Sequence, residues 1–217
     1  MVARDLRKDL ISRLGFEGIS SRVLDAIEAV PRHKFVPEDE EELAYYDTPL
    51  SIGDGQTISA PSMVAVMCDV LDIREGMKVL EVGTGLGYHS AVMSLLAKPG
   101  KIYTVERFAD LAERARSILG ELGYDNVEVF VSDGSEGLAQ FAPYDRISVA
   151  CAAPKVPEPL IEQLKENGKM VIPVGKYTQE LVLVEKIEGK VRMHDRGGVA
   201  FVPMVGKYGF KERGRYI

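Results

Sequence analysis

The chain has 217 residues, of which 46% are hydrophobic, and it carries 27 Lys and Arg against 33 Asp and Glu, giving a formal net charge of −6. This length supports one core with at most a small appendage, and the acidic balance argues against a stable nucleic-acid partner, because such binding depends on basic side chains that meet phosphates. Two isolated cysteines without C-x-x-C spacing argue against a zinc site or a disulfide framework, and no run approaches the roughly 20 apolar residues that span a bilayer.

The N-terminal part of the sequence is helical in pattern. It is charged from the start and lacks the apolar core of a signal peptide, so we expect a cytoplasmic protein that does not bind membranes. Apolar spacing predicts helices over residues 3–14 and from residue 20 or 21 to residue 30. Residues 31–37 are predicted to be extended, and residues 38–44 to form a short helical turn. His33 has no carboxylate or serine partner in sequence, so we interpret it as a surface or locally bonded residue.

Residues 45–63 mix aromatic, glycine and small polar residues, which predicts a long irregular connection. Long loops inside compact domains are often functional. An apolar helix follows over residues 64–71, with Ser59 placed as its N-cap and Pro61 in its first turn. A capped helix start has unpaired N–H groups and partial positive charge, so it can bind an anion. A cap without any ligand is the alternative interpretation.

A glycine motif occupies residues 79–87. A short apolar run that ends in Glu81 breaks into glycines at positions 83, 85 and 87, which predicts a buried strand turning sharply into a helix. The third glycine comes one residue too early for the dinucleotide fingerprint G-x-G-x-x-G, and this spacing disfavours an oxidoreductase. The E-x-G-x-G-x-G pattern instead resembles motif I of the class I S-adenosylmethionine-dependent methyltransferases.

From residue 77 onward, strands and helices alternate. This alternation predicts an α/β fold with a doubly wound, mainly parallel, Rossmann-like sheet, whose ligand site lies at the carboxyl ends of the strands. A β-hairpin through Glu188 and Gly189 follows the sheet core, and residues 197–206 form either a last strand or a loop over the site. The predicted strands are 77–83, 101–106, 127–131, 145–151, 169–174, 180–187 and 190–193, and the predicted helices are 88–97, 108–122 and 157–166.

Three acidic residues lie at successive strand ends beside the glycine turn. Glu106 can accept hydrogen bonds from both ribose hydroxyls of an adenosine, and Asp133 is placed to meet the adenine amino group. Glu81 is expected near the cationic methionine end, or bonded to the backbone of the glycine turn. Any one of these acids alone is better explained as a solvated residue, but three together favour ligand binding.

Several segments together resemble the protein-L-isoaspartate (D-aspartate) O-methyltransferase family, and the likeness covers nearly the whole chain. They are residues 44–50 (A-Y-Y-D-T-P-L), 55–61 (G-Q-T-I-S-A-P), 79–88, 103–107, 143–145 and 198–203 (G-V-A-F-V-P). The stretch over residues 55–61 is much more specific than the glycine motif. The resemblance implies one methyltransferase domain over residues 1–217, with a helical and substrate-loop region at 1–75 and a cofactor-binding sheet core with C-terminal strands at 76–217.

The resemblance also implies an activity: methyl transfer from S-adenosyl-L-methionine to the carboxylate of isoaspartyl residues in damaged proteins, leaving S-adenosyl-L-homocysteine, with no metal. The expected partners are isoaspartyl-containing peptides and proteins, and the expected state is a monomer. Ser59 is the implied active-site residue, and the implied substrate contacts are Thr57, Ile58, Ser59, Val199 and Ala200. The implied cofactor contacts are Gln56, Thr57, Ser59, Met63, Glu81, Gly83, Thr84, Gly85, Gly87, Glu106, Arg107, Asp133 and Gly134. The chain departs from the family pattern at Leu86 and at Ala150-Cys151, where hydroxyl groups are lost.

Other functions share much of this sequence pattern. A methyltransferase acting on tRNA or on a small molecule would share residues 77–175, although the run Ala150–Pro154 lacks the Asn-Pro-Pro-Tyr type of motif used for exocyclic amines. Cys151 as a nucleophile for C5 base methylation is disfavoured by its apolar surroundings. A catalytically silent S-adenosylmethionine-binding protein is the alternative that is not an enzyme.

Overall fold

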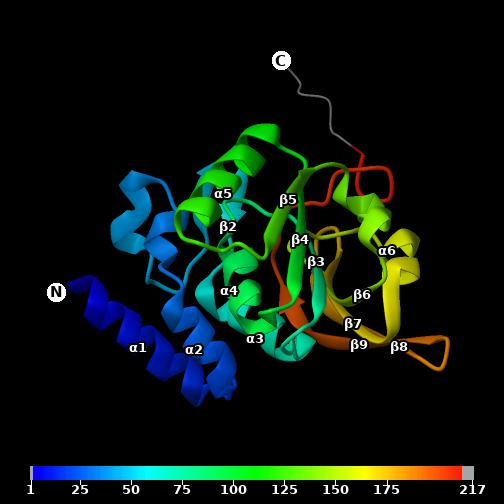
Figure 1. Cartoon of the computed structure of the whole chain (residues 1–217), viewed down its shortest axis with the longest axis horizontal. Helices are drawn as coiled ribbons and strands as arrows, with labels where there is room; N and C mark the ends of the chain where they lie inside the picture. The colour runs from blue at the N-terminus through cyan, green and yellow to red at the C-terminus, as the bar shows by residue number, and fades with distance from the viewer. Residues whose placement is uncertain (1, 212–217) are drawn as a thin grey trace.

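A seven-stranded sheet forms the centre of the protein, which we describe from a computed structural model that places residues 2–211, with side chains from residue 6 (Figure 1). The strand order is β5-β4-β3-β6-β7-β8-β9, and β8 alone runs antiparallel to its neighbours. The strands are β3 Lys78–Val82, β4 Lys101–Glu106, β5 Val127–Val131, β6 Tyr144–Val149, β7 Leu164–Gly175, β8 Gln179–Ile187 and β9 Lys190–Val199. The predicted doubly wound, mainly parallel sheet is confirmed.

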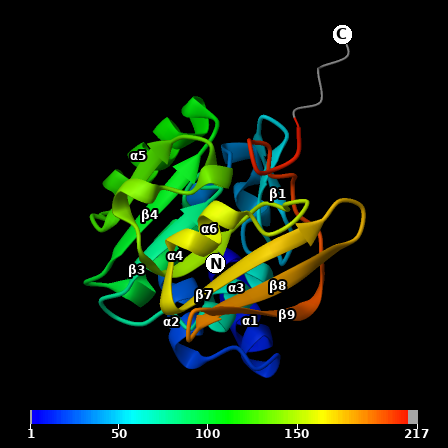
Figure 2. The same ribbon diagram turned by 90° about the vertical axis from the view of Figure 1, so that its right-hand side faces the viewer.

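Helices cover both faces of this sheet (Figures 1 and 2). On one face lie α3 Pro61–Leu71, α4 Tyr88–Ala97 and α5 Ala109–Glu121, with α1 Val2–Phe16 and α2 Ser21–Ala29 stacked outside them. On the other face lie α6 Glu158–Gln163 and the short 3-10 turns η3 Gly134–Glu136 and η4 Ala139–Phe141. Two apolar clusters fill the spaces between these layers, and burial of such side chains is the main driving force for folding.

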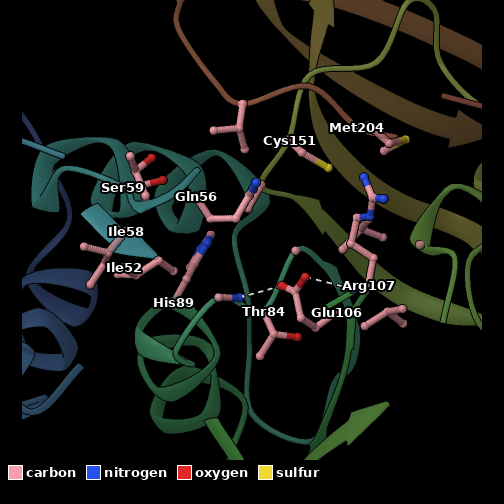
Figure 3. Close-up of a pocket in the computed structure, with 18 of the residues that line it drawn as sticks. Ile52, Gln56, Ile58, Ser59, Thr84, His89, Glu106, Arg107, Cys151 and Met204 are labelled. Atoms are coloured by element: carbon pink, nitrogen blue, oxygen red, sulfur yellow. Dashed lines mark hydrogen bonds between the residues drawn. The ribbon is translucent and has the colours of Figure 1, made fainter. Parts of the chain in front are cut away.

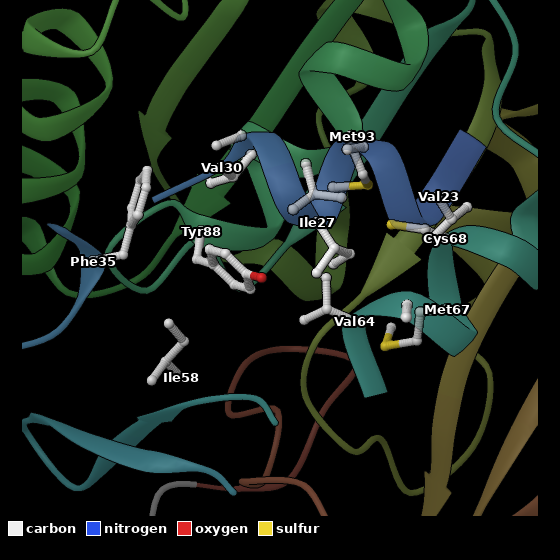
Figure 4. Close-up of a cluster of buried hydrophobic side chains, with 14 of the residues drawn as sticks. Val23, Ile27, Val30, Phe35, Ile58, Val64, Met67, Cys68, Tyr88 and Met93 are labelled. Atoms are coloured by element: carbon white, nitrogen blue, oxygen red, sulfur yellow. The ribbon is translucent and has the colours of Figure 1, made fainter. Parts of the chain in front are cut away.

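The larger cluster joins the N-terminal helices to the sheet core. Figure 4 shows Val23, Ile27 and Val30 of the α2 segment packed close to Tyr88 and Met93 of α4. Helical spacing of those apolar residues in α2 produces this buried face, as the sequence predicts. The N-terminal helices are therefore an integral layer of the core. No helix of residues 2–211 is both long enough and apolar enough to cross a bilayer.

The connection between the N-terminal helices and α3 is more regular than predicted. Arg32–Phe35 forms a 3-10 turn, η1, instead of an extended segment, and the Lys34 N–H donates to the Pro31 carbonyl. The predicted turn that follows is confirmed as η2, Glu38–Leu43. His33 is locally bonded, as expected, because its Nδ1 lies 2.7 Å from the Tyr45 hydroxyl.

The predicted irregular loop over residues 45–63 is wrong, because it contains a β-hairpin. Strands β1 Leu50–Gly53 and β2 Gln56–Ile58 pair antiparallel through a tight turn. Asp54 and Gly55 occupy the turn with φ of 52° and 68°, the left-handed conformation that an Asp-Gly pair favours in hairpins.

Helix α3 also begins differently from the prediction. It starts at Pro61, and Ala60 rather than Ser59 is its N-cap, without a side-chain cap bond. Asp47 supplies the missing acceptor from outside the helix, since its Oδ1 accepts the Ser62 N–H at 2.9 Å. The predicted role of Ser59 as a cap is therefore wrong, and its side chain is free for another purpose.

The C-terminal part follows the prediction with shifted boundaries. Helix α6 ends at Gln163, three residues early, because the chain turns extended at Leu164 to begin β7. The hairpin of β8 and β9 turns through Glu188 and Gly189 as predicted, but β9 continues to Val199. The following residues form a loop across the strand ends, joined to residue 152 by a bridge at Pro203.

Candidate active site

A pocket opens at the carboxyl ends of the parallel strands, beside the point where the strand order reverses around β3 (Figure 3). The carboxyl ends of β3, β4 and β6, the β1–β2 hairpin and the loop after β9 all contribute to its wall. This is the place where open α/β sheets bind ligands. The predicted site residues that line it are Gln56, Thr57, Ile58, Ser59, Gly83, Thr84, Gly85, Glu106, Arg107 and Gly134.

The glycine loop after β3 forms one wall of the pocket. Gly83, Gly85 and Gly87 have φ of 97°, 56° and 95°, a conformation that L side chains rarely adopt. A Cβ on Gly85 would lie 3.1 Å from Cδ1 of Ile52 in the hairpin, so a side chain here would require Ile52 to shift. Gly87 does not line the pocket and instead lets the start of α4 pack against Leu119 of α5.

Glu106, at the end of β4, fastens the glycine loop to the sheet. Its Oε2 accepts the Gly85 N–H at 3.0 Å, while its Oε1 accepts the N–H groups of Arg107 and Phe108 (Figure 3). The carboxylate is buried but still lines the pocket. Because an ionised carboxylate offers about four acceptor positions, it can also accept hydroxyl groups of a ligand.

Glu81 is buried between β3 and α4 and does not line the pocket. Its carboxylate accepts the hydroxyl of Ser90, and that of Thr104 at 2.7 Å, and Oε1 lies 3.6 Å from Nδ1 of His89. Burial raises the pKa of Glu81 to about 7. The structure therefore separates the Glu81 side chain from the pocket wall, and the predicted bond to the glycine-turn backbone is not among its contacts.

Asp133, after β5, faces the C-terminal loop and not the pocket. Its carboxylate accepts the N–H and hydroxyl of Ser135 at 2.9 and 2.7 Å, and the N–H of Lys207 at 2.7 Å. Burial alone would raise the pKa of Asp133, but these hydrogen bonds outweigh it and lower the pKa. The neighbouring Gly134 does line the pocket, packed so closely on Val82 that a Cβ would clash.

The hairpin and Ser59 form the wall opposite Glu106 (Figure 3). The Ser59 hydroxyl makes no hydrogen bond to any described residue, whereas its backbone carbonyl accepts from Arg32. The remaining predicted site residues, Met63, Val199 and Ala200, do not line the pocket. Residues 202–205, which begin two positions after Ala200, line the pocket instead.

Comparison with known proteins adds an independent observation. A family model for protein-L-isoaspartate(D-aspartate) O-methyltransferase (PCMT) matches residues 5–209. A protein-L-isoaspartate O-methyltransferase of Methanocella arvoryzae is 66% identical over 186 residues, which cover 85% of this chain and 99% of the relative. The chain belongs to the protein-L-isoaspartate (D-aspartate) O-methyltransferase family.

Further members of the family extend the match. Protein-L-isoaspartate O-methyltransferase 2 of Archaeoglobus fulgidus is 59% identical over 94% of this chain and 95% of its own. A solved protein-L-isoaspartate O-methyltransferase superposes with a TM-score of 0.86 at 31% identity, covering 94% of this chain and 67% of that one. A Plasmodium falciparum protein assigned to the same activity, solved in complex with S-adenosyl-L-homocysteine, gives a TM-score of 0.82 at 28% identity, with 92% and 98% covered.

Two further residues line the pocket although they are not among the site residues that the sequence predicts, His89 and Cys151. His89 of α4 lines the pocket, and burial lowers its pKa to about 4, so its ring is neutral at physiological pH. Its Nε2 lies 3.3 Å from Sγ of Cys68. The sequence position of His89, at the start of α4 directly after the glycine turn, could have indicated a pocket residue, because helix starts after such turns face the ligand.

Cys151 also lines the pocket of this family member, together with the departures Leu86 and Ala150. Burial raises the pKa of Cys151 to about 12, so the reactive thiolate is scarce at neutral pH. A raised thiol pKa makes nucleophilic attack by Cys151 less favourable, in line with the interpretation from its apolar surroundings. Among the described residues, no group of three or more His, Cys, Asp or Glu side chains is arranged to hold a metal ion.

Proposed function

We propose that this pocket transfers the methyl group of S-adenosyl-L-methionine to the free carboxylate of L-isoaspartyl residues in damaged proteins and peptides. The observation that carries the proposal is that the glycine loop at Gly83–Gly85 and the hairpin end at Gln56–Ser59 line one pocket. The first is a backbone cradle suited to a bulky nucleoside ligand, and the second is the stretch most specific to the family. Donor and acceptor can therefore meet in one place.

The residues present fit the methyl donor. The glycine loop has positive φ where a side chain would be strained, and it leaves backbone exposed to the pocket. Glu106 and Gly134 lie at the ends of neighbouring strands, where they would hold the ribose and adenine parts. Arg107, Thr84 and Gln56 complete the proposed contacts. When bound, S-adenosyl-L-methionine supplies a methyl group on a positively charged sulfur.

The acceptor needs no catalytic base. A free carboxylate has a pKa of about 4, so it is already ionised at neutral pH. An oxygen of the isoaspartyl carboxylate forms the new bond to the methyl carbon, and the electron pair of the broken carbon–sulfur bond stays on sulfur. The protein's contribution is to align these atoms and exclude water. This agrees with a pocket whose His89 is neutral and whose Cys151 is protonated.

Ser59 is the residue proposed to hold the acceptor. Its hydroxyl has no partner among the described residues and it lies on the pocket wall, so it can donate to the substrate carboxylate. Thr57 and Ile58 shape the same wall. Val199 and Ala200 lie outside the pocket, and we propose that they contact the substrate chain beyond the reacting residue.

Transfer of labelled methyl groups to matched peptides tests the function. Three peptides of one sequence would contain Asp, L-isoaspartate or D-Asp at a single position. We expect a base-labile methyl ester on the L-isoaspartyl peptide and none on the Asp peptide, while the D-Asp peptide measures the breadth of the acceptor site. Equal labelling of the Asp and isoaspartyl peptides, or no labelling of either by protein that binds S-adenosyl-L-homocysteine, would refute the proposal.

A further inference from the structure

The side chain of Arg32 is only 1% exposed, although it lies in the charged segment of η1. Its guanidinium donates to three backbone carbonyls, those of Ala44 at 2.5 Å, Thr48 at 3.1 Å and Ser59 at 3.0 Å. Among the residues that the structure describes, no carboxylate forms an ion pair with it. Arg32 is thus a buried charge whose hydrogen-bond acceptors are backbone carbonyls, with a favourable field from Asp47, while its Nε has no hydrogen-bond partner among the described residues.

Such an arrangement is costly unless the hydrogen bonds are well made. Burial lowers the pKa of Arg32, but an arginine remains charged at any physiological pH. Burying a charge without an ion pair is strongly unfavourable, and charge-assisted hydrogen bonds are the compensation. The ring of Tyr88 lies 5.7 Å from the guanidinium carbon and adds a cation–π contact. The rigid fork of arginine is therefore held in one position.

Two of the three acceptors of Arg32 lie at the two ends of the β1–β2 hairpin. Thr48 comes just before β1, and Ser59 comes directly after β2. One guanidinium therefore fixes the base of the hairpin across segments that are 16 and 27 residues away in sequence. Because the peptide group is planar, fixing the Ser59 carbonyl also fixes the direction of the following peptide bond.

A second contact restrains the other side of Ser59. Asp47 accepts the Ser62 N–H at 2.9 Å, so the chain is held both at Ser59 and three residues later. The Ser59 backbone is therefore held by a hydrogen bond at its carbonyl, while its hydroxyl has no hydrogen-bond partner among the described residues. Arg32 itself does not line the pocket, so it acts from behind the wall.

We propose that Arg32 is a positioning residue for the methyl acceptor: by holding the Ser59 carbonyl, it aims the Ser59 hydroxyl at the substrate carboxylate. The inference rests on the role proposed for Ser59. It differs from a purely structural role, in which Arg32 stabilises the fold without any particular relation to that hydroxyl. The two roles differ in whether the effect of losing Arg32 depends on Ser59.

A double-mutant cycle separates them. The affinity of a fluorescently labelled L-isoaspartyl peptide would be measured on protein saturated with S-adenosyl-L-homocysteine, for wild type, Arg32→Met, Ser59→Ala and the double variant. We expect Arg32→Met to weaken peptide binding by about tenfold or more when Ser59 is present, and by less than about threefold in the Ser59→Ala background. Equal factors in the two backgrounds would overturn the proposal.

Arg146 provides the matched control. It is 7% exposed and likewise donates to backbone carbonyls, those of Leu71, Asp72 and Asp145. It lies near the amino end of β6, whereas the pocket lies at the carboxyl ends of the strands. Arg146→Met should lower stability without any Ser59-dependent effect on peptide binding. If it showed the same dependence as Arg32→Met, the coupling would reflect general loosening, and the proposal would be wrong.

Arg32→Lys keeps the experiment decisive if Arg32→Met does not fold. A lysine retains the positive charge, but its compact ammonium cannot reproduce the planar fork that spans three carbonyls. We expect the same Ser59-dependent loss of affinity, and equal losses in both backgrounds would again refute the role. Failure of the proposed function looks different: wild-type protein would then bind S-adenosyl-L-homocysteine and still show no preference for the isoaspartyl peptide over its Asp counterpart.

Discussion

The backbone N–H of Gly85 donates to the Glu106 carboxylate over 3.0 Å, so the glycine loop after β3 is tied to the end of β4. The same carboxylate also accepts the first two N–H groups that follow β4. One side chain thereby shapes the loop and faces the pocket. Glu106 at the end of β4 therefore shapes the glycine loop in addition to any contact that it makes with a ligand.

Replacing Glu106 by Gln tests this role. The amide keeps the shape of the side chain but loses the charge that strengthens its hydrogen bonds. Hydrogen bonds to charged groups contribute about 1.5–3 kcal/mol, so S-adenosyl-L-homocysteine should bind roughly 10- to 100-fold more weakly in calorimetry. Glu113→Gln, on the exposed face of α5, is the control and should bind like wild type. Unchanged affinity in Glu106→Gln would exclude a role in ligand binding.

Gly85→Ala should damage both the fold and the pocket. A non-glycine residue at φ of 56° costs about 1–2 kcal/mol, and the new Cβ would press on Ile52 at 3.1 Å. We expect a loss of this size in the free energy of unfolding, together with weaker ligand binding. Gly120→Ala in α5 is the matched control, because nothing lies within 4 Å and alanine favours helices by about 1 kcal/mol. An unchanged urea midpoint in Gly85→Ala would contradict this account.

The sequence predicts the sheet well because its strands are mostly apolar runs, and these runs recur at regular intervals between helical segments. The residues of each run are enough to indicate a buried strand without information from distant segments. The sequence predicts the ligand edge of the sheet for the same reason, since the carboxyl ends of parallel strands must meet. The β1–β2 hairpin is not predicted from the sequence even though Asp54-Gly55 is a strong turn signal, because alternation over strands of four and three residues covers too few positions to separate them from a loop.

Other parts of the site depend on contacts between distant segments. Serine is a residue type that commonly caps helices, which is why Ser59 is predicted as the cap of α3. In the structure Asp47 accepts the N–H of Ser62, 15 residues away in sequence, in the first turn of that helix.

Glu81 and Asp133 lie at the strand ends that the sequence predicts. Each carboxylate nevertheless accepts hydrogen bonds from nearby hydroxyl or N–H groups, and neither side chain lines the pocket. Residues 202–205 line the pocket, as the loop alternative for residues 197–206 predicts, but no periodicity in the sequence decides between that loop and a last strand.

The buried Glu81 carboxyl should make stability depend on pH. Its folded-state pKa of about 7 is above the ordinary value of 4.5, so the stability it contributes is complete below pH 4.5 and is lost as pH rises through 7. His89, with a pKa lowered to about 4 from an ordinary value of 6.5, acts in the opposite direction, and its effect continues above pH 6.5 until the unfolded-state histidine has lost its proton. Between pH 6.5 and 8 the loss from Glu81 is therefore about half cancelled, and we expect the free energy of unfolding to fall by roughly half a kcal/mol.

Urea unfolding of the ligand-free protein at pH 6.5, 7.2 and 8 measures this slope. Glu81→Gln cannot ionise, so its free energy of unfolding should not fall across the same range. Glu113→Gln, at an exposed carboxylate paired with Arg116, serves as a control for a general loss of negative charge. A slope that persists unchanged in Glu81→Gln would assign the pH dependence to another group.

Asp133 links the C-terminal loop to the site, and Asp133→Asn should loosen that link. The charged acceptor for the N–H groups of Lys207 and Ser135 becomes a weaker neutral one. Because residues 202–205 form part of the pocket wall, S-adenosyl-L-homocysteine should bind roughly 3- to 10-fold more weakly. Amide hydrogen exchange over residues 204–210 should be faster in the variant even without ligand.

Asp125→Asn, at an exposed side chain, is the control and should change neither the affinity nor the exchange rate. If affinity fell while exchange in the ligand-free protein stayed at the wild-type rate, Asp133 would act by touching the ligand directly, and its bond to the loop would have no part in binding.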